Sequence, residues 1–269
     1  LVLKTFFKTD YRGIVAFLHD LPQLRDAIGL QAVPHFTTLQ KAAHRLLRFA
    51  TVRQLLDASL RSMFGRKRRI KRAAIDSSGF EAGQVSPYFV KRRSRIAGIW
   101  HTTTYTRFPK LNLICDCTTH MILAIYPTRG PTPDVKQLLM TLRQCASSVR
   151  IERIIADAGY DSESNHRTLR EERGITTIIP PKIGRPTTKP ASGHYRRLRQ
   201  KLFCHPQRVN YGQRWQVETV FSMIKRNLGH AIAAKKYWSQ CQQLLLLTIT
   251  HNLMILLWCI TKVFYRAGR

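Results

Sequence analysis

Acidic residues are scarce in this sequence. Its 269 residues include 15 Asp and Glu against 45 Lys and Arg, which gives a formal net charge of +30 at pH 7. Such a charge repels itself unless a polyanion neutralises it, so we expect a nucleic acid or an anionic membrane as the partner. Basic runs at 66–72, 91–95 and 196–201 favour nucleic acid over membrane.

Cysteine pairs of the zinc-binding type are also missing. None of the six cysteines forms a Cys-x-x-Cys pair, and Cys115, Cys117 and Cys204 do not supply the two regularly spaced half-sites that zinc usually needs. We therefore expect reduced thiols in a cytoplasmic protein, associated with the DNA of the nucleoid.

A long uninterrupted apolar run is absent as well. Residues 244–260 are apolar enough to suggest a membrane span, but the run is short, and Thr248, Thr250, His251 and Asn252 interrupt it. The sequence therefore predicts a buried core helix and no membrane partner. Because 44% of the residues are hydrophobic, the chain is a globular protein with a core and not a disordered basic tail.

Hydrophobic periodicity divides the chain into two parts. Residues 1–64 have the spacing of short helices, which predicts either a helix-turn-helix-like module, truncated at its N-terminus, or a helical lid without a DNA role. The basic run at 65–72 predicts a linker. Residues 73–269 alternate strand and helix patterns, with an exposed insertion at about 180–210, and this order predicts an α/β domain with a mixed sheet flanked by helices.

Two acids occupy matching positions in the predicted sheet. Asp76 and Asp157 each follow a short apolar strand and precede a turn of small residues. One acid in such a place favours a turn or a helix cap, but two at strand ends indicate a ligand site. Glu218, the only acid from residue 173 to the end of the chain, makes a third candidate.

Three carboxylates cannot gather unless protons or cations neutralise them. Oxygen ligands suit Mg²⁺ or Mn²⁺. Two such ions about 3.5–4 Å apart would support in-line displacement at a phosphodiester. The predicted site therefore holds two divalent ions on Asp76, Asp157 and Glu218.

Glu218 lies in a pattern of four polar residues, Tyr211, Arg214, Glu218 and Lys225. On a single helix these positions fall within about 60° of one another. The apolar residues fall on a different arc, which predicts a buried face made of Val217, Val220, Phe221, Ile224 and Leu228. The polar stripe, about 21 Å long, can follow several phosphates of DNA. The alternative is a solvated face with an Arg214–Glu218 ion pair.

These motifs resemble the signature regions of DDE transposases of prokaryotic insertion sequences, in the branch with the Tyr-Arg-Glu-Lys signature. The matching segments are Ala74-Ile75-Asp76-Ser77, Ala156-Asp157-Ala158-Gly159-Tyr160-Asp161-Ser162, and residues 211–226. The resemblance covers the chain from about residue 10 to its end. It implies a ribonuclease H-like fold that cleaves double-stranded DNA at transposon ends and joins the 3′-hydroxyl to a target, within a homodimeric synaptic complex.

Carried over residue by residue, the resemblance makes Asp76, Asp157 and Glu218 the metal ligands and catalytic residues. Tyr211, Arg214 and Lys225 would position the DNA backbone, and Lys110 would also bind DNA, since Pro109-Lys110-Leu111-Asn112 matches a family-like stretch. Two alternatives remain, a related nuclease that does not join DNA and a DNA-binding protein that has lost its chemistry.

Several other polar residues have structural interpretations. Asp161 is predicted to cap a helix and Asp116 to stabilise a turn. His251 and Asn252 are predicted to form a satisfied buried pair within a core helix. Trp215 could pack against the protein or stack on a base.

Overall fold

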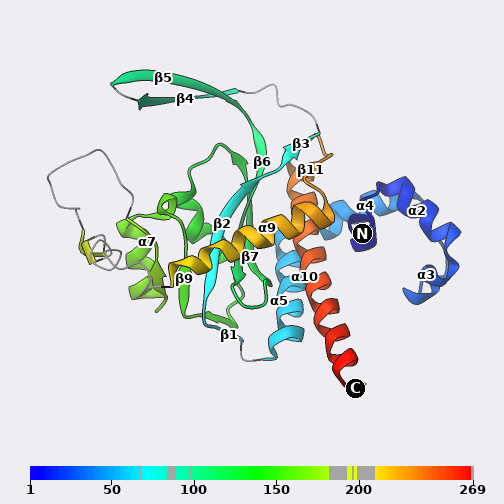
Figure 1. Cartoon of the computed structure of the whole chain (residues 1–269). Coiled ribbons are helices and arrows are strands. Elements are labelled where there is room, and N and C mark those ends of the chain that lie inside the picture. Colours follow the sequence, from blue (N-terminus) through cyan, green and yellow to red (C-terminus); the bar gives the residue numbers. More distant parts are fainter. Residues whose placement is uncertain are drawn as a thin grey trace.

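The computed structural model describes residues 1–66, 68–83, 89–96, 98–181, 193–195, 197–198 and 210–267. At its centre is a five-stranded mixed sheet with the strand order β10-β9-β2-β6-β7 (Figure 1). The strands are β2 (Ala73–Gly79), β6 (Phe108–Asp116), β7 (Ile122–Gly130), β9 (Arg153–Ile155) and β10 (Thr176–Ile178). β2, β6 and β7 are antiparallel neighbours, whereas β9 is parallel to both β2 and β10. The predicted mixed α/β architecture is confirmed.

The strands are buried on both faces, and their alternating side chains supply two cores. In β2, Ala74 belongs to one core while Ala73 and Ile75 belong to the other. This division follows from the two-residue period of a strand. Helices α9 (Trp215–Leu228) and α10 (Tyr237–Ala267) supply the first core, whereas α6 (Gln137–Arg143) packs into the second.

Helix α9 crosses the front of the sheet in Figure 1. Its buried residues are the predicted ones, Val217, Val220, Phe221, Ile224 and Leu228. Because they share one face at helical spacing, the opposite face of α9 remains available to solvent. The sequence pattern thus fixes both the position of α9 and the direction of its polar residues.

Five helices precede the sheet: α1 (Val2–Phe6), α2 (Tyr11–Asp20), α3 (Pro22–Ala27), α4 (Phe36–Leu46) and α5 (Phe49–Phe64). Ala43 of α4 and Val52 of α5 lie in the same core as α9 and the sheet. Part of the helical region therefore packs directly on the rest of the molecule. The division of the chain at residue 64 stays a prediction.

Two segments differ from their predicted secondary structure. Residues 68–70 of the predicted linker form β1 (Arg68–Ile70), which pairs with β8 (Val149–Ile151). The basic run obscured this strand, because Arg68 is buried and forms an ion pair with Asp57. The basic run at 91–95, where no strand was predicted, lies in β4 (Phe89–Ile96), which forms a hairpin with β5 (Ile99–Thr106). Its polar side chains gave no apolar pattern from which to predict a strand.

Most of the predicted insertion at 180–210 lies outside the described residues. The remaining short elements are β3 (Glu81–Ala82), β11 (Ala231–Ile232), α7 (Glu163–Arg167), the 3₁₀ turns η1 (Asp134–Lys136), η2 (Ala158–Tyr160) and η5 (Tyr211–Arg214), and the π-helical turn η3 (Thr168–Glu172).

Helix α10 has a buried half and an exposed half. In the described part of the chain, it is the one helix long and apolar enough to cross a membrane, with 56% of its apolar window buried in the protein. Residues 244–252 are all buried, as predicted for a core helix, whereas apolar side chains on either side of them, such as Trp238, Leu257 and Trp258, reach solvent. The Nε2 of His251 donates to the carbonyl of His120 at 3.0 Å. Asn252 accepts from the backbone N–H of Ile122 and donates to the Ile122 carbonyl, so the predicted buried polar pair is satisfied.

Candidate active site

Asp76 lies within β2, and Asp157 lies just beyond the end of the neighbouring parallel strand β9. The predicted turn after Asp76 is wrong, because β2 continues to Gly79 and stays paired with β6. Ala74 of β2 pairs with Ile155 of β9, and both acids follow two residues further along their chains. The Asp76 carboxylate accepts a hydrogen bond from the backbone of Ser77 at 2.8 Å, and the Asp157 carboxylate accepts one from Gly159 at 2.9 Å. The sheet therefore places the two acids at one edge, as parallel strands require.

The two aspartates influence each other electrostatically. The pKa of Asp76 is raised to about 6, mainly by burial and also by the nearby charges of Asp157 and Asp134, while the Ser77 backbone hydrogen bond and Arg214 oppose the shift. A carboxylate that is buried beside other carboxylates favours either a proton or a cation. This edge of the sheet is therefore short of positive charge.

Arg214 connects this edge to α9. Its Nη1 lies 3.4 Å from Oδ2 of Asp76, and its Nη2 forms an ion pair with the Glu218 carboxylate one helical turn away. Glu218 is thus held by the arginine, and 52% of its side chain is exposed. Within the described residues, no three Asp, Glu, His or Cys side chains are gathered closely enough to hold a metal ion as they stand. The convergence of Asp76, Asp157 and Glu218 on metal ions stays a prediction.

Tyr211 and Lys225 flank Arg214 and Glu218 from opposite directions. Tyr211 lies in the 3₁₀ turn η5 and not in the predicted single helix, so its angular position differs from the predicted stripe. Burial raises the pKa of the Tyr211 hydroxyl, an effect that Arg214 opposes. Lys225 donates to the Ser78 hydroxyl at 2.8 Å and lies 5.2 Å above the ring of Phe80. Both residues therefore face the end of β2 that carries Asp76.

Lys110 lies deeper than a residue that contacts DNA freely. Its side chain is 12% exposed, and its ammonium group donates to the Asp134 carboxylate at 2.6 Å and to the Thr132 carbonyl at 3.1 Å. Two of its three donors are therefore used within the protein. The structure places Lys110 at the edge of the site, where its shortest hydrogen bond is to the carboxylate of Asp134.

Sequence reasoning missed that acid, Asp134. It accepts hydrogen bonds from Lys110 and from the Ser77 hydroxyl at 2.8 Å, so it contacts the residue that follows Asp76. Tyr160, whose ring is fully buried, lies close enough for Asp134 and Asp76 to raise the pKa of its hydroxyl, which burial raises most. Asp134 opens η1, and at the start of a predicted helix nothing distinguished it from an ordinary terminal acid.

The structural interpretations of two other acids have different outcomes. Asp116 accepts from the backbone and the hydroxyl of Thr119, which confirms its role in a turn. Asp161 does not cap α7, because Ser162 does so by accepting from the backbone of Asn165 at 3.1 Å. Asp161 is instead buried within 3.5 Å of the His166 ring. Asp161 and Ser162 are both residue types that cap helices, and the sequence alone does not show which of the two caps α7. Trp215 is 54% exposed at the start of α9, so packing does not enclose it.

The family model for the transposase DDE domain matches residues 67–253, which include all the residues of the candidate site. The chain belongs to the DDE transposase family. This transposase-family chain matches no curated protein. Among solved structures, it is similar to the piggyBac transposase in a cryo-EM structure of its synaptic complex with hairpin DNA. The identity is 13% and the TM-score 0.38, over 69% of this chain and 46% of that chain. The chain thus spans about half of the length of that protein.

Proposed function

We propose that this protein is a metal-dependent DNA transposase of a prokaryotic insertion sequence. It would cleave transposon ends and join the 3′-hydroxyl to target DNA. The observation that carries the proposal is the proximity of Asp76, within β2, to Asp157, just beyond the parallel strand β9, and to Arg214 of the turn that leads into α9. Three antiparallel strands beside two parallel ones support the ribonuclease H-like assignment of the sheet.

The donor set suits Mg²⁺ or Mn²⁺, because hard divalent ions prefer carboxylate oxygens. Asp76 and Asp157 would hold the ions, with Glu218 as the third ligand, and two ions are proposed. The raised pKa of Asp76, caused mainly by burial, is the observation that favours a cation at this edge. When bound, the ions would polarise the scissile phosphate and stabilise its attacking and leaving oxygens.

The residues of α9 and η5 would hold the DNA. The planar guanidinium of Arg214 can exchange its two carboxylate partners for a phosphate, which would release Asp76 and Glu218 toward the metal ions. Lys225 would supply a point charge to the backbone and Tyr211 a hydrogen bond to a phosphate oxygen. Lys110, paired with Asp134, would support this end of the sheet and reach DNA only if that pair opens.

The partner would be double-stranded DNA, both at the transposon ends and at the target. A net charge of +30 supports a polyanionic partner and a location on the nucleoid in the cytoplasm. Since two transposon ends have to be held together, the active form would be a homodimer in a synaptic complex.

The test uses a supercoiled plasmid that carries the coding sequence with its natural flanking DNA. Wild type and Glu218→Gln are incubated with Mg²⁺, with Mn²⁺ or with EDTA, and the ends and junctions are sequenced. Cleavage at fixed ends that requires both the metal and Glu218, followed by joined products, is expected for the transposase.

Other outcomes distinguish the alternatives. Metal-dependent cleavage without joined products would identify a related nuclease. Tight DNA binding without cleavage would identify a DNA-binding protein that has lost its chemistry. Cleavage by Glu218→Gln at the wild-type rate would remove Glu218 from the site.

A further inference from the structure

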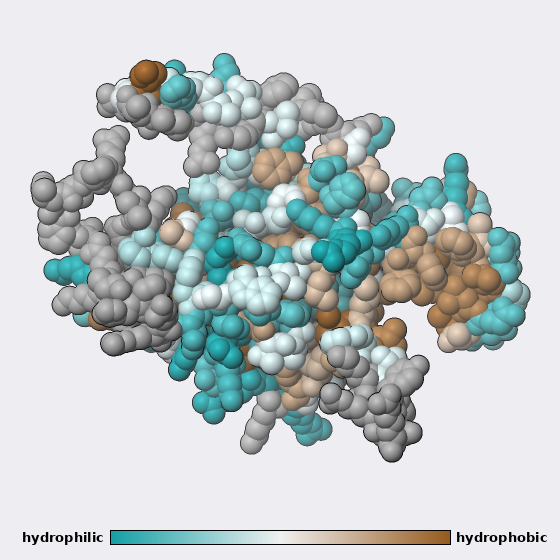
Figure 2. Space-filling view, in the orientation of Figure 1, coloured by the Kyte–Doolittle hydropathy of each residue, from teal (hydrophilic) through white to brown (hydrophobic). Residues whose placement is uncertain are grey.

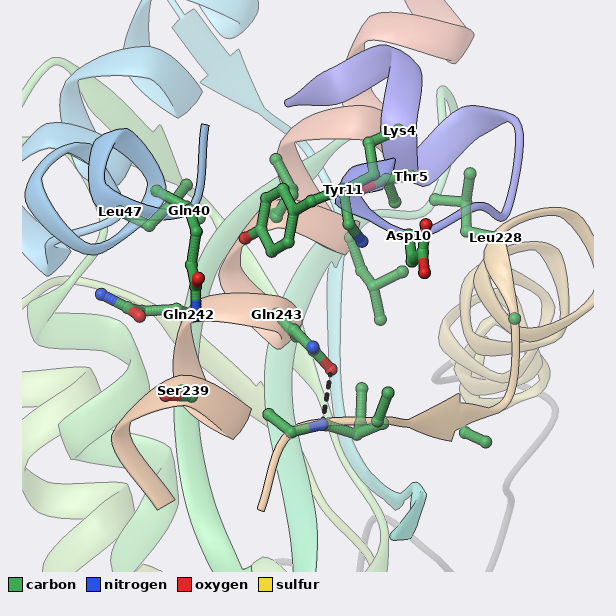
Figure 3. A pocket seen from close by; sticks show the side chains of 18 of the residues that line it. Lys4, Thr5, Asp10, Tyr11, Gln40, Leu47, Leu228, Ser239, Gln242 and Gln243 are labelled. Carbon is green, nitrogen blue, oxygen red and sulfur yellow. Dashed lines mark hydrogen bonds between the residues drawn. The ribbon is translucent and has the colours of Figure 1, made fainter. Parts of the chain in front are cut away.

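A cavity of about 660 Å³ lies between the N-terminal helices and the segment that joins α9 to α10 (Figure 3). Its lining combines residues from both ends of the chain, among them Lys4, Lys8 and Tyr11 on one side and Lys235, Lys236 and Gln243 on the other. Asp76, Asp157 and Glu218 do not line it. The cavity is therefore a separate feature from the candidate active site.

Basic side chains surround this cavity, whose floor is largely apolar. Lys8, Lys235, Lys236, His44 and His230 are exposed residues on its wall, and Lys4 is half-buried there. The acid on the wall is Asp10, whose carboxylate accepts from the backbone of Gly13 at 2.7 Å and caps α2. His230 has an exposed acid 3.6 Å away, Glu81. Among the described carboxylates, none forms an ion pair with Lys235 or Lys236, so their charges are available to an anion.

The cavity is continuous with α9. Leu228 and Gly229, at the end of that helix, line it, and the ammonium group of Lys8 donates to the carbonyl of Arg226 at 2.9 Å. Gly229 has φ of +110°, a conformation that other residues rarely adopt, and there the chain turns into β11 and then the lysine pair. Arg214 and the basic cavity therefore lie at opposite ends of one helix.

The length of α9 sets the spacing between these two sites. A helix from Trp215 to Leu228 is about 21 Å long. Each strand of duplex DNA presents a phosphate about every 3.4 Å along its axis, so this length corresponds to about six nucleotides. Figure 2 shows hydrophilic residues along the face that carries α9, whereas hydrophobic residues gather over α2 and α3. A duplex that follows α9 would leave the active site and reach the cavity without crossing the apolar surface.

We propose that this cavity binds the phosphodiester backbone of the DNA duplex about six nucleotides from the scissile phosphate, through Lys235 and Lys236. The inference rests on the proposed function, because it takes the scissile phosphate to lie at Asp76 and Arg214. It adds a contact outside the signature residues and makes the N-terminal helices one wall of the DNA path.

A second basic cavity provides a matched control. It measures about 840 Å³ and is lined by arginines, including Arg69, Arg150 and Arg173, at the edge of the sheet near β8 and β10. Arg69 there forms an ion pair with Glu152, and no residue of α9 lines this cavity. Basic charge alone would make the two cavities equivalent, whereas a path along α9 reaches only the first.

The experiment compares Lys235→Gln/Lys236→Gln with Arg150→Gln/Arg173→Gln, since both pairs are exposed and both changes remove two charges. Affinity for a duplex that carries the cleavage site is measured by fluorescence anisotropy over a range of salt concentrations. Losing two phosphate contacts should weaken binding about tenfold at 0.15 M salt and lower the salt slope by about two. The Arg150→Gln/Arg173→Gln variant should keep an affinity and a salt slope near the wild-type values.

Neutral methylphosphonates placed singly along the duplex locate the contact. In wild type, substitutions about six nucleotides from the cleavage site should weaken binding, and in the lysine variant the same substitutions should have no further effect. Equal losses from both variant pairs, or a lysine variant with wild-type affinity and salt slope, would overturn the proposal. The affinity and the salt slope are measured without catalysis, whereas the proposed function fails if the wild-type protein does not cleave DNA or cleaves it without joining.

Discussion

The guanidinium group of Arg214 lies 3.4 Å from the carboxylate of Asp76, on a different segment of the chain. The same group holds Glu218 by a second ion pair, so one arginine neutralises two of the three acids that the proposed reaction requires. Without DNA or metal ions, this arrangement offsets the repulsion at the edge of the sheet. With DNA, the arginine and the acids would each gain a new partner.

Changing Arg214 to Gln should therefore separate DNA binding from metal binding. We expect a weaker affinity for duplex DNA and a salt slope lower by about one, because one phosphate contact is lost. Mn²⁺ binding in the absence of DNA should be unchanged or tighter, since no guanidinium competes for Asp76 and Glu218. Anisotropy titrations and calorimetry measure the two affinities.

Arg143→Gln is the control for Arg214→Gln, because Arg143 is exposed on α6 and is not among the site residues. It should leave both affinities at their wild-type values. If Arg214→Gln kept the wild-type DNA affinity, the arginine would have only a structural role. This result would support the alternative in which Arg214 and Glu218 form an ion pair on a solvated helix face.

The sequence predicts best the elements whose periodicity is set by burial. Helix α9 has the predicted buried face, and β9 ends just before Asp157, because apolar spacing reports directly on which side of an element meets the core. β2 contains Asp76 but continues to Gly79, since the polar residues Ser77 and Ser78 hid the rest of the strand. Strand β1 and the β4–β5 hairpin were missed for the opposite reason. Their side chains are mostly polar or basic, and their backbone pairing leaves no apolar pattern.

The candidate site was predictable only in part, because some of its contacts join residues that are far apart in the sequence. Glu218 stands out by its isolation in a basic segment, and Asp76 and Asp157 by their matching positions after apolar segments, but nothing in the order of residues shows where Asp134 lies. Asp134 is 57 residues from Ser77, with which it forms a hydrogen bond. Such a contact depends on how η1 packs over the sheet. The turn at Tyr211 was likewise missed, since a 3₁₀ turn and an α-helix share their first residues' patterns.

Asp76→Asn should stabilise the protein while abolishing metal-dependent cleavage. A carboxyl with a raised pKa holds its proton more tightly in the folded state than in the unfolded state, so ionising Asp76 destabilises the fold. This destabilisation is absent below about pH 4 and complete above the folded pKa of about 6. At pH 7.5 the neutral amide removes it, and the free energy of unfolding should rise by about 1–3 kcal/mol. Urea denaturation without divalent ions measures the change.

Mg²⁺ provides a second readout of the same residue. It should raise the melting temperature of wild type, because an ion that binds only the folded state stabilises it, and have less effect on Asp76→Asn. Asp20→Asn, at an exposed position on α2, should show neither difference. A destabilised Asp76→Asn protein would mean that Arg214 or Ser77 already compensates the buried charge.

The Lys110–Asp134 pair should be strongly coupled. Lys110→Met leaves the Asp134 carboxylate without its main charged partner, and Asp134→Asn leaves the ammonium group only the Thr132 carbonyl and a neutral amide. Each single change should destabilise the protein by about 2 kcal/mol, while the double change should cost less than the sum of the two. Urea denaturation of the four proteins gives the coupling energy. Additive effects would show that the two residues act independently.

His251→Gln should make the protein less sensitive to acid. Burial lowers the pKa of His251 to about 4, from an ordinary value of 6.5, although its hydrogen bond to the His120 backbone opposes the shift. Below pH 6.5 the unfolded chain takes up a proton that the folded protein does not, so stability falls as the pH falls toward 4. Between pH 7.5 and pH 5 this residue should account for a loss of about 2 kcal/mol.

Glutamine keeps a donor for the His120 carbonyl but does not titrate. Poorer packing of glutamine lowers the stability of the variant at pH 7.5, but the difference from wild type should shift in favour of the variant by about 2 kcal/mol at pH 5. His19→Gln, at an exposed position on α2, should show no such shift. If urea denaturation gave the same difference at both pH values, His251 would have to be protonated equally in the folded and unfolded states, which its position inside α10 opposes.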